Sequence, residues 1–167
     1  METTLDIIAV IISAIALLVA GWCGVITRTH NRVSIKPYCA IIERYHEKNI
    51  AVVILNRGLG PLVIDQIDVF NGHEHKDNLI EFMPTVNQFW KGFSLEICGR
   101  AIMPDHEVCL CAIEPNSTEI RDQILRAIST ITIVVNYHDS YGKKYNVKKE
   151  LTWSKLFLEG SLGYRAE

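Results

Sequence analysis

Three groups of residues in this chain carry side chains that can bind metal ions or exchange protons. The first is the run His73–His75, in which two histidines flank a glutamate, with Asp77 close behind. Histidines at i and i+2 point to the same side of a strand, as metal ligands must. However, the run follows Asn71-Gly72, a pair typical of tight turns. We therefore expect a solvated hairpin tip and no bound metal.

The second group is the cysteines. The sequence has five of them: Cys23, Cys39, Cys98, Cys109 and Cys111. Cys109 and Cys111, at i and i+2, are predicted to share one face of a strand, but a zinc site needs further ligands at close spacing. Only the distant Cys98 and His106 are available, so we expect buried free thiols. An odd, irregular set also does not predict a disulfide framework and fits a reducing compartment.

The third group is Asp65 and Asp68, which lie on opposite faces of a strand unless a β-bulge realigns them. We expect them to be surface carboxylates. The sequence has no nucleophile motif, phosphate loop or dinucleotide fingerprint. The run Asn56–Pro61 is rich in glycine, but it joins two predicted strands and therefore lacks the strand-to-helix geometry that cradles a phosphate. These observations predict a protein that is not an enzyme and uses no cofactor.

One patch has the composition of a binding site, because basic and aromatic side chains alternate in it. Its members are Tyr141, Lys143, Lys144, Tyr145, Lys148 and Lys149. Such patches bind phosphate-bearing ligands or single-stranded nucleic acid, and they also contact anionic lipid headgroups. The alternative is a solvated hairpin whose lysines protect an edge strand. Glu2 and Asp6 are the only charged residues before Arg28. From Arg28 onward, 17 acidic residues balance 17 basic ones, and this absence of net positive charge argues against generic nucleic-acid binding.

The element that must position these groups is an apolar stretch near the N-terminus. Ile7–Ile26 holds about 20 residues without a charge, enough for a helix to cross the roughly 30 Å hydrocarbon core of a bilayer. A cleaved signal peptide requires Lys or Arg before its apolar stretch, and the residues before Ile7 include neither. Trp22 occupies the place where a lipoprotein signal needs a small residue before Cys23. The stretch is therefore predicted to be a retained single-pass anchor.

Basic residues predict the orientation of that anchor. Arg28, Arg32 and Lys36 follow the apolar stretch, whereas Glu2 and Asp6 precede it. Since positive charge stays on the cytoplasmic side, we expect the N-terminus outside and the rest of the chain in the cytoplasm, at the inner membrane.

Small residues recur along one face of the predicted anchor. They are Ala9, Ser13, Ala16, Ala20 and Gly24, and Asp6 and Thr27 extend the same face as its polar ends. Small residues at this spacing let helices approach closely in lipid, so the face predicts a homo-oligomer. A chance alignment is the alternative, and a water path along this face is the more specific hypothesis.

The remaining chain predicts a mainly β domain. The expected division is an N-terminus 1–6, an anchor 7–26, a connector 27–31, a β domain 32–153 and a tail 154–167. Seven to nine short strands are predicted, the first from Arg32 to Tyr38 and others at 39–45, 50–55, 62–70, 79–83, 93–97, 107–113, 131–137 and 145–153. A change of apolar parity indicates a bulge near Asp65-Gln66. One helix is expected after Asn116, with Glu119 completing a capping box. This pattern favours an immunoglobulin-like antiparallel β-sandwich, with a small closed barrel as the alternative.

Several motifs occur in an order that resembles small bacterial single-pass membrane proteins of unassigned function with a cytoplasmic β-sandwich. They are His30-Asn31-Arg32-Val33-Ser34 with Pro37, Asn56-Arg57-Gly58-Leu59-Gly60-Pro61, and Tyr137-His138-Asp139 with Gly142. These are turn and strand motifs, so the resemblance implies a fold and no reaction. The outline is also similar to compact membrane effectors of antiviral defence.

Two functions follow as hypotheses. The first is a membrane-anchored, self-associating protein whose β domain is an interaction module that senses a ligand or partner protein. The second is an oligomeric pore-forming or membrane-disrupting effector of antiphage defence, an ion channel gated by a nucleotide or nucleic-acid signal on the β domain.

Overall fold

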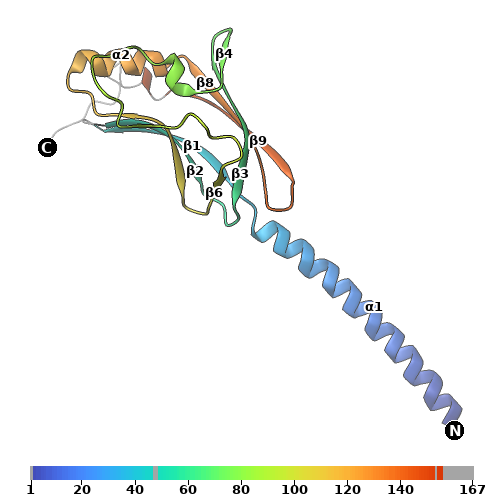
Figure 1. Ribbon diagram of the computed structural model, residues 1–167. Helices are drawn as coiled ribbons and strands as arrows, with labels where there is room; N and C mark the ends of the chain where they lie inside the picture. Colours follow the sequence, from blue (N-terminus) through green and yellow to red (C-terminus); the bar gives the residue numbers. More distant parts are fainter. Residues whose placement is uncertain (1, 47–48, 153, 156–167) are drawn as a thin grey trace. The chain divides into compact units, whose positions relative to one another are not determined.

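The computed structural model describes residues 2–46, 49–152 and 154–155, and the chain divides into two compact units between Lys36 and Pro37. The first unit is one helix, α1 (Glu2–Ser34), and the second is a mainly β domain (Figure 1). From Asp6 to Ser34, α1 is long and apolar enough to span a membrane, and none of its apolar stretch is buried.

The helix is longer than the sequence pattern predicts. We expected a connector at 27–31 and a strand from Arg32 to Tyr38; the strand prediction is wrong, because α1 continues to Ser34. Nothing between Thr27 and Ser34 breaks a helix, and the hydroxyls of Thr29 and Ser34 donate to carbonyls four residues earlier, at 3.0 and 2.9 Å. The helix ends just before Pro37, which disfavours helical geometry in the residue before it.

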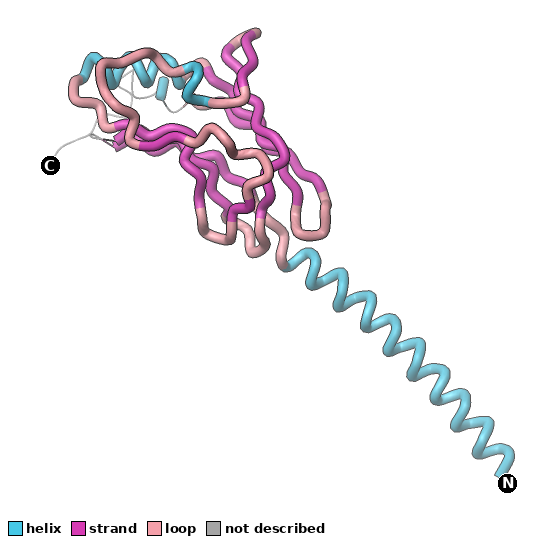
Figure 2. Tube along the Cα trace, in the orientation of Figure 1, coloured by secondary structure: helices cyan, strands magenta, loops and turns pink. Residues whose placement is uncertain are grey.

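The β domain has nine strands within the described residues, divided between two antiparallel sheets (Figure 2). They are β1 (Cys39–His46), β2 (Asn49–Asn56), β3 (Leu62–Asn71), β4 (Glu74–Lys76), β5 (Gly92–Phe93), β6 (Ala101–Ile102), β7 (Glu107–Ile113), β8 (Ile131–His138) and β9 (Lys144–Glu150). One sheet has the order β1-β2-β7-β5, and the other has the order β4-β3-β8-β9, with β6 pairing with β3. The mainly β prediction is confirmed, and two separate sheets do not fit a single closed barrel.

The two sheets share one apolar core. Ile54 and Val52 of β2, Ile64 of β3 and Ile133 of β8 are all fully buried in it. The strand β2 lies between β1 and β7 and is buried on both faces, as its uninterrupted apolar run predicts. The strand β8 alternates strictly between buried and half-buried residues, so its sheet has one face on the core and one facing outward.

A short amphipathic helix, α2 (Thr118–Ile128), links β7 to β8 and packs Ile124, Leu125 and Ile128 into the core. The helix itself was predicted, but its cap was not: the Ser117 hydroxyl, rather than Asn116, accepts the Ile120 N–H at 3.3 Å. The short strand expected at 79–83 is instead a 3₁₀ turn, η1 (Leu79–Phe82). The strand expected at 93–97 is reduced to the two residues of β5.

Two β-bulges shift the pairing registers. The bulge predicted near Asp65-Gln66 is confirmed, since the pairing of β3 with β8 shifts between Ile64 and Gln66. A second bulge, which was not predicted, leaves Leu110 of β7 unpaired, because Val53 pairs with Cys109 and Val52 with Cys111. Trp153 and the expected tail beyond residue 155 lie outside the described residues.

Candidate functional site

The outer face of the β4-β3-β8-β9 sheet carries a group of hydrogen-bonded polar side chains. Its inner face carries Ile64, Ile67 and Val69 of β3, all buried. The β3 bulge changes what the outer face receives: Asp65 and Gln66 are both exposed there, and Asp68 follows two residues after Gln66. The bulge therefore brings the two aspartates of β3 to the same face, which strict alternation would prevent.

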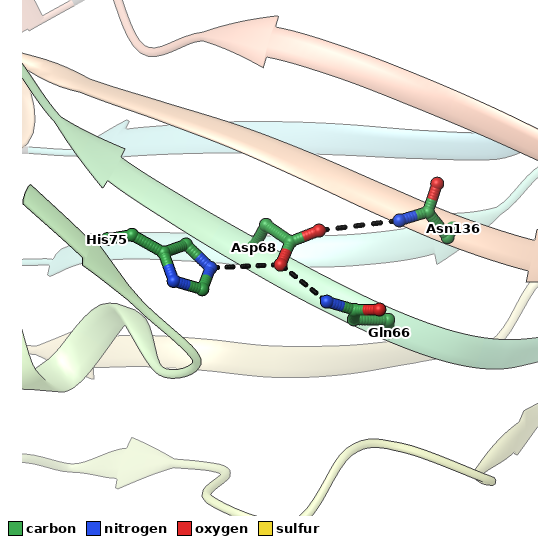
Figure 3. Close-up of polar contacts among 4 residues, drawn as sticks. All are labelled: Gln66, Asp68, His75 and Asn136. Carbon is green, nitrogen blue, oxygen red and sulfur yellow. Dashed lines mark hydrogen bonds and ion pairs between the residues drawn. The ribbon is translucent and has the colours of Figure 1, made fainter. Parts of the chain in front are cut away.

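Asp68 is the centre of a hydrogen-bond network on this face (Figure 3). Its Oδ1 accepts from Gln66 Nε2 at 2.7 Å and lies 2.9 Å from His75 Nε2. Its Oδ2 accepts from Asn136 Nδ2 of β8 at 3.4 Å. The Asp68 side chain is only 15% exposed, whereas His75 is 45% exposed. The network thus has a half-buried carboxylate at its base and an imidazole at its outer rim.

A second aspartate–histidine pair lies further along the same strands. His138 Nδ1 is 2.7 Å from Asp65 Oδ1, and both side chains are about one-third exposed. The pair joins the bulge of β3 to the end of β8, because Val63 and His138 are register partners. The face therefore carries two separate aspartate–histidine contacts, Asp68 with His75 and Asp65 with His138.

Three residues at the rim of the face fit the ligand preferences of a divalent metal ion. One ligand atom from each of Asp68, His75 and Asp77 lies within 4.8 Å of the others. One imidazole with two carboxylates is a donor set that several transition metals accept. Here, however, Asp68 Oδ1 and His75 Nε2 already contact each other, which leaves these atoms committed to their own pair. His73, which the sequence pattern placed beside His75, is not part of this group.

A shallow acidic hollow of about 640 Å³ adjoins the β3 bulge. Asp65 and Gln66 form one wall, and Asp77, Glu96 and Cys98 come from two loops. Three carboxylates in one hollow favour ligands that carry positive charge or hydrogen-bond donors.

The predicted basic and aromatic patch divides between two faces of β9. Lys144 and Lys148 are exposed on the outer face, whereas Tyr145 and Lys149 point inward and are half-buried. Lys149 Nζ donates to the Ile41 carbonyl at 2.9 Å and lies 3.4 Å from Glu43 Oε1, whose side chain is 1% exposed. The inward lysine therefore bridges the open seam between β9 and β1. It is held by one sheet against the other and does not join the outer lysines.

The remaining patch residues belong to the turn between β8 and β9, which is organised by Asp139. Its Oδ1 accepts the backbone N–H groups of Tyr141 and Lys143, both at 2.9 Å, and its Oδ2 accepts the Tyr145 hydroxyl at 3.1 Å. Burial alone would raise the pKa of this carboxyl, but the N–H donors and the tyrosine hydroxyl together hold it below its usual range. Gly142, at φ +77°, closes the turn.

Two of the cysteines, Cys39 and Cys111, are buried thiols. All five are free, and burial raises the pKa of Cys39 and of Cys111 to about 12, so both remain protonated near neutral pH. The prediction that Cys109 and Cys111 share a face is wrong, because the Leu110 bulge turns Cys111 into the core and leaves Cys109 half-buried on the other side.

The small-residue face of α1 is fully exposed within the chain. Ala9, Ser13, Ala16, Ala20 and Gly24 are exposed, as are Asp6 and Thr27 at its polar ends. The Ser13 hydroxyl donates to the Ala9 carbonyl at 2.8 Å, so its hydrogen bond is made within the helix.

Sequence reasoning missed one buried residue that organises a set of loops. The Asn56 side chain is fully buried; its Nδ2 donates to the Gly60 and Ile102 carbonyls at 2.8 and 2.9 Å. Its Oδ1 accepts the N–H groups of Tyr38 at 3.3 Å and Gly58 at 3.0 Å. The available signal was a polar residue directly between an apolar strand and a glycine-rich loop. The aspartate–histidine pairs had no such signal, because their partners lie in different strands.

Comparison with known proteins adds no family to this description: no family model matches the chain, and no curated protein matches it significantly.

Proposed function

We propose that this protein is a membrane-anchored, self-associating interaction module, in which α1 spans the inner membrane and the outer face of the β4-β3-β8-β9 sheet binds a partner protein or ligand. The observation that carries the proposal is the exposure of α1. An apolar helix with no buried side chain exposes far more apolar surface than a soluble monomer does, and a bilayer is the solvent that covers it.

The domain also fits the proposed immunoglobulin-like plan. In that plan one sheet has the strand order A-B-E-D and the other contains C-F-G. The sheet β1-β2-β7-β5 corresponds to the first order, and β3-β8-β9, extended by β4, corresponds to the second. Domains of this plan commonly present an open sheet face or end loops to a partner. This correspondence supports the sandwich plan, and the proposal assigns its open sheet face to a partner.

The anchor is tested by fractionation of cells that express the full chain. We expect the protein in the inner-membrane pellet after alkaline carbonate treatment, and in the soluble fraction only after detergent. The orientation is tested by reporters at the two ends, with a C-terminal fluorescent fusion active in the cytoplasm. Release by carbonate would contradict the anchor, and an inactive cytoplasmic reporter would contradict the orientation alone.

The binding face is tested by photo-crosslinking in the same cells. A photoreactive amino acid in place of Asn146, which is exposed on the outer face between Lys144 and Lys148, is expected to give a discrete adduct. The matched control is the same replacement at Gln123, an exposed position on α2. Equal adduct patterns at the two positions would contradict a specific role for the outer face.

Self-association is tested on the small-residue face. Ala16→Leu with Ala20→Leu fills the surface that close packing needs, so the oligomer is expected to fall to a smaller species in mild detergent. The control is Ile11→Leu with Ile15→Leu, on other faces of α1. Unchanged assembly in the Ala variant would contradict packing through this face.

The pore-forming effector is a second candidate, favoured by the alignment of Asp6, Ser13 and Thr27 with the small residues. If that face lines a water path, Ser13→Leu should reduce depolarisation of cells that express the protein. No depolarisation by the unaltered protein under any inducing condition, including phage infection, would contradict a pore.

A further inference from the structure

The end of the β domain at which the chain enters is built from four segments, which we call the entry end. These are Tyr38, the loop 57–61, the loop 103–106 and the turn 139–143. The Arg57 N–H donates to the Tyr38 carbonyl and the Asp105 N–H to the Asn56 carbonyl, both at 2.8 Å. Since Val63 pairs with His138, the turn after β8 lies next to the start of β3. Figure 1 shows these loops extending from the same end of the domain, opposite α2.

The tips of these segments carry large apolar or aromatic side chains that are at least half exposed. Leu59 is 74% exposed, Tyr38 62%, Met103 54% and Tyr141 50%. Exposed apolar side chains gathered at one end of a domain favour an interaction surface, because leaving them in water does not stabilise the fold. Tyrosine at such a surface is typical of the boundary between water and lipid.

Basic side chains surround these tips. Arg57, Lys143 and Lys144 are exposed in or directly beside the entry-end loops. Three carboxylates lie in or directly beside these loops: Asp105 is exposed, Glu107 is paired with Arg44, and Asp139 is 6% exposed and engaged by the donors of its own turn. The outward charge of the entry end is therefore positive, and it is mixed with apolar side chains.

Chain length keeps this end close to the helix that the proposed function places in the membrane. Only Ile35 and Lys36 separate Ser34 from Pro37, and two residues extend by less than about 10 Å. The eight helical residues from Thr27 to Ser34 rise about 12 Å beyond the apolar stretch. The headgroup layer takes up roughly 5–8 Å of that rise. Whatever the angle between helix and domain, the entry point lies within about two Debye lengths of the headgroups at physiological salt.

We propose that the entry end is a lipid-contacting surface, which rests on anionic headgroups through Arg57, Lys143 and Lys144 and places Leu59 and Tyr141 at the membrane interface. The inference rests on the proposed anchor and goes beyond it, because it assigns the membrane as partner to one end of the β domain. Apart from Lys144, which lies where the two surfaces meet, the outer sheet face described above is left for a different partner.

The test places a photoreactive probe at the two ends of the domain. Leu59→p-benzoylphenylalanine is compared with Phe89→p-benzoylphenylalanine in the full chain, reconstituted in nanodiscs of phosphatidylcholine and phosphatidylglycerol with an alkyne-tagged lipid. Phe89 is a matched control, since it is 96% exposed and lies at the opposite end: its neighbour Gln88 accepts the Asn116 N–H at 3.0 Å, just before α2. Neither replacement removes a buried side chain.

We expect the lipid adduct at position 59 to exceed that at position 89 several-fold. We also expect it to fall when Arg57→Glu is combined with Lys143→Glu, and to fall in discs of phosphatidylcholine alone. Equal adducts at the two positions, in protein that remains embedded in the disc, would overturn the lipid contact while leaving the anchor intact. An adduct at 59 that ignores both charge reversal and lipid charge would overturn the role of the basic residues. Loss of the chain from the disc would remove the anchor, and the inference with it.

Discussion

The helices α1 and α2 differ in where their apolar side chains lie. The helix α1 has 33 residues, and from Ile7 to Ile26 its apolar side chains face outward on every side. The helix α2 has 11 residues, and it buries Ile124, Leu125 and Ile128 while its charged side chains face water. An amphipathic stripe finds its partner within the domain, whereas a helix that is apolar all round needs a partner outside the chain. The contrast explains why α2 stabilises the fold, whereas α1 is proposed to anchor the domain in a membrane.

The largest effect is expected from charges in the middle of α1. Ile12→Lys combined with Ile15→Lys places two charges at the centre of the span, each costing about 2.5–3.5 kcal/mol of insertion free energy. We expect the protein to leave the membrane pellet, or to be degraded, while its β domain keeps its unfolding free energy. The control is Ile26→Lys, whose charge can reach the interface from the end of the span. Normal membrane retention of the double variant would contradict the proposed role of α1.

Truncation of a buried α2 side chain is expected to lower the stability of the β domain without changing membrane retention. Ile124→Ala leaves a cavity in the core, so the β domain should lose about 2–5 kcal/mol of unfolding free energy, measured by urea denaturation. Its membrane retention should not change. The exposed neighbour Gln123→Ala is the control and should shift stability by much less. A large shift in the control would show that α2 is sensitive for reasons other than burial.

A smaller loss is expected at Asn56, which stabilises the loops rather than the sheets. Asn56→Ala removes the side-chain partner of four backbone groups. They are the N–H groups of Tyr38 and Gly58 and the carbonyls of Gly60 and Ile102. Leaving a buried polar group unpaired costs about 1–3 kcal/mol, so the thermal midpoint of the domain should fall measurably. Hydrogen exchange should accelerate first at residues 57–61. Uniform acceleration across all strands, with no local change, would contradict the assigned role.

The smallest effect concerns pH. The pKa of Asp139 is held below its usual value of 3.8, so the ionised carboxylate stabilises the fold above that value. This contribution is lost as pH falls through the folded-state pKa. Asp139→Asn should therefore weaken the dependence of stability on pH below about 4, with little change in slope near neutrality. The measurement is a set of denaturation curves recorded across the acid range. An unchanged dependence of stability on pH in the variant would contradict the role assigned to Asp139.

The sequence pattern predicted most elements of the fold because their apolar spacing is regular. The strands β2, β7 and β8 match their predicted ranges to within one residue at each end, and the β3 bulge followed from a change of parity. The pattern failed where a few residues fitted two periods. The segment around Val33 alternates as a strand does, but it continues an established helix, and adding residues to a helix avoids the cost of nucleation.

The candidate site was less predictable because its geometry depends on pairings between distant residues. Asp65 and His138 are far apart in sequence and meet only through the register of β3 with β8. The contact of Lys149 with the Ile41 carbonyl likewise required both sheets to be in place. Bulges had the strongest influence, because one bulge united the aspartates and the other separated Cys109 from Cys111.

The central proposal is that α1 holds an independently folded β domain at the membrane, to which the entry end adds only a salt-sensitive contact. A protease site inserted between Ile35 and Lys36 allows the two units to be separated in membranes whose cytoplasmic side is accessible. After cleavage and a high-salt wash, we expect the β domain in the supernatant with the thermal midpoint of the uncut protein, and α1 in the pellet. A β domain that stays in the pellet through high salt, or that unfolds when it is released, would contradict the claim.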